Sequence, residues 1–182
     1  TYAVPAGAAG DWLGQDGRLA IRSNGGWVFA DPKTGWRASI VEDGKSAVFD
    51  GAAWVTDTLA ISPNGAQSRF EVVEFDHPIG PGAVSVTSVE IPQYAMVFSV
   101  TGRVKAEITG TLSGWELGVA GAGNRYGGGL GLAAGSWLMG ITGQPVTYYG
   151  ATPLELTAMG GDFAGGEVRL ALHYYLPTPP TV

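Results

Sequence analysis

The residues best suited to binding a ligand lie in a glycine-rich stretch between Trp115 and Tyr149. Aromatic rings pack against the apolar faces of sugar rings, while arginine and asparagine side chains donate hydrogen bonds to hydroxyl and carboxylate groups. Loops that glycine shapes into rigid turns reduce the entropy lost on binding. The residues that we take as candidate ligand-binding residues are Asn124, Arg125, Tyr126, Trp137, Tyr148 and Tyr149.

Each of these candidates also has a structural interpretation, which for any single residue is the favoured one. Trp115 and Trp137 could belong to a hydrophobic core, and Arg125 could pair with a carboxylate of a neighbouring subunit. Tyr148 and Tyr149 must point to opposite faces if they share a strand, because successive side chains of a strand alternate. The stretch therefore predicts either a recognition surface or a tightly packed subunit contact.

Signals for catalysis and for metal binding are weak. The two histidines, His77 and His173, are not at metal-ligand spacing, and the chain contains no cysteine. No nucleophile elbow is present, and the glycines of residues 121–131 are followed by no helix that would form a dinucleotide site. We therefore predict no catalytic residue, no metal and no cofactor. A polysaccharide depolymerase would need a carboxylate pair, and sequence position pairs none of Glu107, Glu116, Glu155 and Asp162.

Composition indicates an all-β protein that binds neither nucleic acid nor a membrane. Of the 182 residues, 45% are hydrophobic, only 14% are charged and 30 are glycine. The net charge of −6 gives no broad attraction to nucleic acid or to anionic lipid. No apolar run approaches the length of a membrane span. Because the chain starts at Thr1 without an initiator methionine, we expect a fragment or a processed form of a longer protein.

Residues 1–57 predict a small Trp-rich β-hairpin module. Hairpin turns are signalled by Asp16-Gly17, Asn24-Gly25, Asp43-Gly44 and Asp50-Gly51. An internal repeat relates residues 17–28 to residues 44–55, and each copy predicts a strand, a turn and a second strand. We expect the core of this module to be Trp12, Trp27, Trp36 and Trp54. Ser62-Pro63-Asn64-Gly65 signals a turn or a linker, so residues 58–67 are assigned to a linker.

Residues 68–182 predict a jelly-roll-like β-sandwich. Short runs of alternating or continuous apolar residues recur with turns between them, and no segment shows a capped helical period. Clear examples are Phe70–Phe75, Tyr94–Val100 and Val168–Tyr175. We assign this segment to a receptor-binding module.

Most of the chain resembles a known family. Its first part resembles the end of a domain of unknown function that is common in alphaproteobacterial prophage tail fibres and gene transfer agents, through Gly10, Trp12, Gly14, Asp16-Gly17, Ala20, Trp27, Phe29, Pro32, Gly35-Trp36, Phe49-Asp50-Gly51 and Trp54. Its second part resembles the module that often follows that domain, through residues 117–121, 125–127, 131–136, 151–154 and 168–174.

The resemblance implies a fibre or spike that meets the host cell surface, such as the head spike of a rhodobacterial gene transfer agent that recognises capsular polysaccharide. We accordingly expect a non-enzymatic adhesin on the surface of a phage-like particle, which is extracellular after release. Its expected partners are a host surface polysaccharide, two further copies in a homotrimer and other fibre or spike proteins. A purely structural trimerisation or connector module is the first alternative, and a polysaccharide depolymerase is the second.

Overall fold

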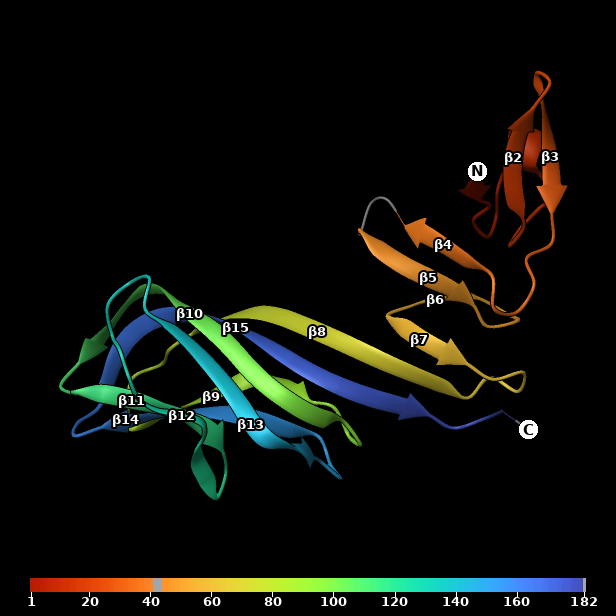
Figure 1. Ribbon diagram of the computed structural model, residues 1–182. Helices are drawn as coiled ribbons and strands as arrows, with labels where there is room; N and C mark the ends of the chain where they lie inside the picture. The colour runs from red at the N-terminus through yellow and green to blue at the C-terminus, as the bar shows by residue number, and fades with distance from the viewer. Residues whose placement is uncertain (41–43, 182) are drawn as a thin grey trace. The chain divides into compact units, whose positions relative to one another are not determined.

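The computed structural model describes residues 1–40 and 44–181 (Figure 1). Within these ranges the regular elements are strands, apart from the 3-10 turn η1 (Gly10–Trp12), so the predicted all-β fold class is confirmed. No helix in the described part of the chain is long and apolar enough to cross a membrane. The chain divides into two compact units, which are Thr1–Arg69 with Thr178–Val182 (unit 1) and Phe70–Pro177 (unit 2).

Unit 1 contains two three-stranded antiparallel sheets. The first consists of β1 (Tyr2–Ala3), β2 (Leu19–Ser23) and β3 (Gly26–Ala30). The second consists of β4 (Arg37–Ile40), β5 (Lys45–Phe49) and β6 (Trp54–Thr56). The hairpins β2–β3 and β5–β6 are the two copies of the internal repeat, so each copy forms a strand, a turn and a strand as predicted.

The turn between β2 and β3 has the conformation that its sequence predicts. Asn24 and Gly25 both have positive φ angles, 48° and 81°, as the primed hairpin turns require. Asp43, which with Gly44 predicts a second turn of this kind, lies outside the described residues.

The tryptophans of unit 1 do not form the buried core that the sequence suggests. Trp12 and Trp27 are only half-buried and pack edge to face with their ring centroids 5.2 Å apart, and Trp36 is exposed. The fully buried hydrophobic side chains of this unit are smaller on the whole, namely Val4, Ala20, Ala47, Val48 and Phe49. A module of this size has too little interior to cover four indole rings.

The segment assigned to a linker is part of a hairpin. Residues 58–61 form β7 (Thr58–Ile61), which pairs with the first residues of β8 (Gln67–Pro78). The Ser62–Gly65 turn joins the two strands through a hydrogen bond from the Gly65 amide to the Ser62 carbonyl, 3.0 Å long. The turn signal is therefore real and lies within a hairpin, and the division between the two compact units follows shortly after it, between Arg69 and Phe70.

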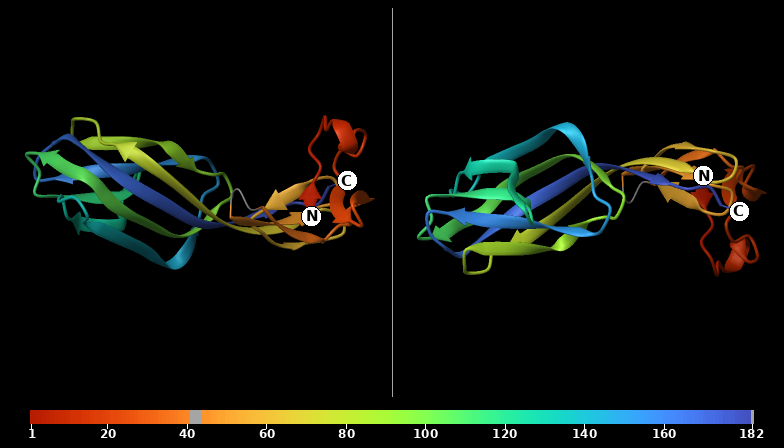
Figure 2. Two further views of the ribbon diagram at one scale, coloured as in Figure 1. Left: turned by 90° about the horizontal axis from the view of Figure 1, so that it is seen from above. Right: turned by 90° about the horizontal axis from the view of Figure 1, so that it is seen from below.

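Unit 2 is a sandwich of two antiparallel sheets (Figure 1, Figure 2). The first sheet has the strand order β13-β10-β15-β8, with β7 paired to the start of β8, and the second has the order β12-β11-β14-β9. The remaining bounds are β9 (Val84–Ile91), β10 (Met96–Gly110), β11 (Gly114–Val119), β12 (Ala122–Leu130), β13 (Trp137–Thr147), β14 (Thr152–Met159) and β15 (Phe163–Thr178).

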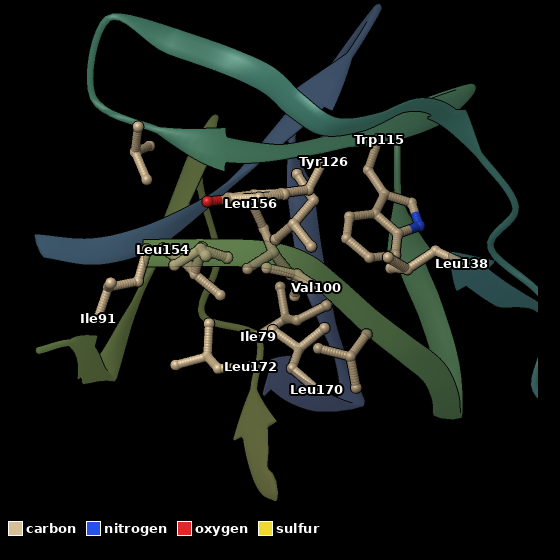
Figure 3. Close-up of a cluster of buried hydrophobic side chains, with 14 of the residues drawn as sticks. Ile79, Ile91, Val100, Trp115, Tyr126, Leu138, Leu154, Leu156, Leu170 and Leu172 are labelled. Carbon is tan, nitrogen blue, oxygen red and sulfur yellow. The ribbon is translucent and has the colours of Figure 1, made fainter. Parts of the chain in front are cut away.

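The strand order of unit 2 is that of a jelly roll. When β8 to β15 are renumbered from one to eight, the sheets have the orders 6-3-8-1 and 5-4-7-2, so every connection between consecutive strands crosses from one sheet to the other, apart from the β11–β12 hairpin. The inner faces of the two sheets form one core, in which Trp115, Leu154, Leu156 and Leu170 are fully buried (Figure 3).

Candidate ligand-binding site

Two of the predicted ligand-binding residues belong to the core of unit 2. Tyr126 on β12 is 2% exposed (Figure 3), and Tyr148, just after β13, is 8% exposed. Their hydroxyl groups are hydrogen-bonded to each other at 2.7 Å. Burial raises the pKa of Tyr126 far above its ordinary value, and the bond to Tyr148 adds to this shift. Because both rings are enclosed, the structural interpretation of Tyr126 and Tyr148 replaces the binding one.

The other candidates are exposed, and two of them lie at opposite ends of β13. Asn124 and Arg125 are exposed on β12, Trp137 opens β13, and Tyr149 follows the far end of β13. A strand rises about 3.3 Å per residue, so the length of β13 separates Trp137 from Tyr149 by far more than one sugar ring. The predicted residues therefore do not form a single site. Among the exposed ones, Trp137 lines a hollow on the protein surface.

Trp137 stands on the outer face of the β13-β10-β15-β8 sheet. It is 66% exposed, and Met139 and Ile141 follow it on the same side of β13, at 61% and 69% exposed. Leu138 and Gly140 alternate with them and are buried on the core side. We call this outer surface the Trp137 face.

Strand pairing places polar side chains of β10 directly beside this apolar row. Arg103 is the cross-strand partner of Trp137, and Thr101 is the partner of Met139. On the other side of β10, Arg103 is paired with Arg169 of β15. A shallow hollow of about 640 Å³ lies over these strands, and its lining consists of Glu74, Thr101, Gly102, Arg103, Trp137, Leu138, Met139, Arg169, Leu170 and Ala171.

Most charges on the Trp137 face are compensated. Arg169 makes a bidentate ion pair with Asp76, with nitrogen–oxygen distances of 2.6 and 2.8 Å. Lys105 donates to Asp76 at 2.6 Å and to Glu167 at 3.0 Å. The hydrogen bonds from Arg169 and then from Lys105 hold the pKa of Asp76 far below its usual range. This network fixes the basic groups on the β8 side of the face.

Arg103 has a different environment. Its Nη1 donates to the Gly135 carbonyl at 3.1 Å, and among residues 1–40 and 44–181 it has no ion pair with a carboxylate. The turn that holds this carbonyl is closed by a bond from the Ser136 amide to the Ala133 carbonyl, and Gly135 has the positive φ of 87° that suits glycine. The guanidinium is thus anchored next to Trp137 with most of its donors free.

Of the four carboxylates considered for a depolymerase, strand pairing brings two near each other. Glu116 is opposite Thr157 and Glu155 is opposite Gly118, so the two glutamates are diagonal neighbours on the outer face of the second sheet. Neither lines the hollow beside Trp137. This arrangement gives the depolymerase alternative a specific carboxylate pair to test.

The histidines are held by hydroxyl groups. His77 and Ser85 are both buried, at 7% exposed, and the His77 Nε2 is 2.9 Å from the Ser85 Oγ. His173 Nε2 is 2.9 Å from the Thr101 Oγ1 on the Trp137 face. A substrate has no access to the buried pair. Within the described part of the chain, no three histidine, cysteine or acidic side chains gather as they would around a metal ion.

Sequence reasoning found Trp137 but missed Thr101, Arg103 and Arg169. The sequence does indicate that Thr101 and Arg103 point outward, because they alternate with the apolar Val100 and Val104. Their position beside Trp137 depends on pairing between strands that are more than thirty residues apart in sequence, as the Arg103–Trp137 pair shows. A local pattern carries no such information.

Comparison with known proteins gives a partial match. Residues 1–55 match the model of DUF2793, which is described as a protein of unknown function. No curated protein matches the chain. A chain of the cyanophage Pam1 capsid asymmetric unit is 24% identical over 62% of this chain and 85% of that chain, with a TM-score of 0.43. A TM-score this low supports no inference about function.

Proposed function

We propose that this chain is a host-surface adhesin of a phage-like particle, either a tail fibre or a head spike, and that unit 2 binds capsular or cell-surface polysaccharide without cleaving it. The resemblance described above supports the particle, and the DUF2793 match covers the first of the two resembling parts. In this proposal the protein lies on the particle surface and acts together with other fibre or spike proteins.

The observation that carries the binding proposal is the exposure of Trp137. A tryptophan that is 66% exposed on a regular strand contributes little to the core of unit 2, and its ring borders a hollow that also contains guanidinium, hydroxyl and carboxylate groups. An indole ring offers a flat apolar surface, and the flanking polar groups offer donors and acceptors for sugar hydroxyls. Because the site stands on paired strands rather than on a loop, little entropy is lost on binding.

Avidity completes the proposal. One shallow site binds a sugar weakly, but a homotrimer presents three copies, and a particle with several fibres presents more. Multivalent attachment raises the apparent affinity without any new contact.

The experiment compares binding of the purified chain to encapsulated cells and to matched cells without capsule, with soluble capsular polysaccharide as competitor. We expect capsule-dependent binding that competitor abolishes and that Trp137→Ala weakens at least about fivefold, since one such contact contributes on the order of 1 kcal/mol or more. Tyr149→Ala is the matched control, because Tyr149 is 78% exposed at the other end of β13. Equal binding to both cell types, or an unaffected Trp137→Ala, would refute the proposal.

A connector function is the second candidate, and the apolar area around the hollow favours it. Met139 and Ile141 continue the exposed row along β13, and Phe70 and Val72 are exposed on β8. Tryptophan, methionine and arginine are enriched at protein–protein contacts. This function predicts that the Trp137 face is covered by another subunit, that Ile141→Glu reduces the mass measured by light scattering, and that no glycan binds.

A further inference from the structure

We infer that the Trp137 face selects an acidic sugar, whose carboxylate is bound by Arg103 while its ring packs on Trp137. This inference rests on the glycan-binding function proposed above and adds the chemical class of the ligand. It depends on the charge balance of the face and on the strand register.

Among the residues that the structure describes, the charge balance of this face leaves Arg103 available to a ligand. Of the basic side chains on this face, Arg169 is neutralised by Asp76, and Lys105 by Asp76 and Glu167. Arg103 is paired with a backbone carbonyl, and the described residues supply it with no carboxylate partner. Guanidinium groups bind carboxylates through two parallel hydrogen bonds, and one bond to Gly135 leaves donors for that geometry.

The strand register sets the distance over which the ligand must reach. Arg103 and Trp137 are direct cross-strand partners, and neighbouring strands lie about 4.8 Å apart. This spacing is close to the width of one sugar ring, so a ring stacked on Trp137 brings a substituent carboxylate within reach of Arg103. Arg169 is the next residue in the same row, but its charge is already compensated by Asp76.

The acidic groups of the face are farther from Trp137. Glu74 lines the hollow from β8, which is three strands from β13 and hence roughly 14 Å away. Glu74 is only 3.8 Å from Arg169, which partly offsets its charge. Because the chain as a whole has a net charge of −6, long-range electrostatics oppose an acidic ligand, and selectivity must come from Arg103.

The test is an array of acidic polysaccharides, each printed beside its carboxyl-reduced neutral derivative. It is probed with the full chain and with the variants Arg103→Gln and Glu74→Gln. Both side chains are exposed, so neither change removes core packing. We expect wild-type protein to prefer the acidic member of at least one pair. Arg103→Gln should lose that preference by about tenfold or more while it retains binding to the neutral member. Glu74→Gln should strengthen acidic binding, since it removes a repelling charge.

Each outcome decides between the two proposals. Equal binding to acidic and neutral members, with dependence on Trp137, would overturn the acidic selectivity and leave the glycan-binding function intact. An acidic preference that survives Arg103→Gln would also overturn it. Binding to no glycan on the array would overturn both proposals together.

Discussion

The hydrogen bond between Tyr126 and Tyr148 gives the sharpest quantitative prediction. Replacing either tyrosine by phenylalanine leaves the other hydroxyl in the core without a partner, which costs about 1 to 3 kcal/mol. Tyr148→Phe should be the more damaging change, because it strands the hydroxyl of Tyr126, which is 2% exposed, whereas Tyr148 is 8% exposed. We expect roughly 2 to 3 kcal/mol for Tyr148→Phe and roughly 1 to 2 kcal/mol for Tyr126→Phe.

The double variant separates this reasoning from general loss of packing. Removing both hydroxyls leaves no unpaired group, so Tyr126→Phe/Tyr148→Phe should be close to wild type, with a coupling energy of at least about 1 kcal/mol. Urea unfolding measures the free energies, and each kcal/mol should also shift the melting temperature by about 4 °C. Additive losses, or single losses below about 0.5 kcal/mol, would refute the account. Glycan binding should be unchanged in all three variants, since neither hydroxyl reaches the surface.

Two further predictions concern the core of unit 2. Gly140→Ala should destabilise the unit by about 1 to 3 kcal/mol in urea unfolding, because the new methyl group would meet the backbone of Tyr126. The control is Gly143→Ala on the same strand, where the methyl group enters open space and stability should change by less than about 0.5 kcal/mol. Equal effects of the two changes would contradict the packing argument. Burial lowers the pKa of His77 below 6.5, so the imidazole binds a proton more readily in the unfolded chain than in the folded one. The free energy of unfolding should therefore be highest above pH 6.5 and fall as the pH drops toward the folded-state pKa. His77→Asn should flatten this decline between about pH 7.5 and 5.5, and an unchanged slope would show that other groups cause it.

The fold class could be predicted from sequence because turn residues and apolar alternation are local signals. Asn24 and Gly25 form their predicted turn. Tyr148 is buried and Tyr149 is exposed, but they lie just beyond the end of β13 and do not share a strand. The same reasoning could not tell which partner of an alternating pair faces the core. Tyr126 and Tyr148, which were predicted to bind a ligand, are therefore core residues, whereas Trp137 is exposed.

Strand β9 shows why that choice is not local. Its valines, Val84 and Val86, are exposed, and the polar Ser85 and Thr87 point inward. Thr87 accepts a hydrogen bond from the Leu154 amide at 3.0 Å, beside the proline at which the β9–β14 ladder shifts register. Ser85 bonds His77. The inward phase of β9 is thus fixed by partners on β14 and β8, and the partner on β14 is 67 residues away from Thr87 in sequence.

The glycine-rich stretch also serves packing more than recognition. Gly118 and Gly140 lie where the backbone of β12 approaches so closely that a methyl group would collide with it. These positions let β11, β12 and β13 close one end of the sandwich around Trp115 and Tyr126. The density of glycine therefore indicates close packing of the strands. The proposed binding surface is the Trp137 face, on the side of β13 that points away from this core.

The adhesin and connector functions use the same surface in incompatible ways. A neighbouring subunit that packs on Trp137, Met139 and Ile141 would cover Arg103. Its guanidinium would then be desolvated with no carboxylate partner among residues 1–40 and 44–181. Burying an unpaired charge is costly, so such a subunit would have to bring an acidic group of its own. A flexible, hydrated acidic glycan meets the same requirement and leaves the rest of the apolar row free. Arg103, which has no carboxylate partner in the described part of the chain, is therefore the feature that favours a soluble ligand over a permanent partner, more than the exposed indole does.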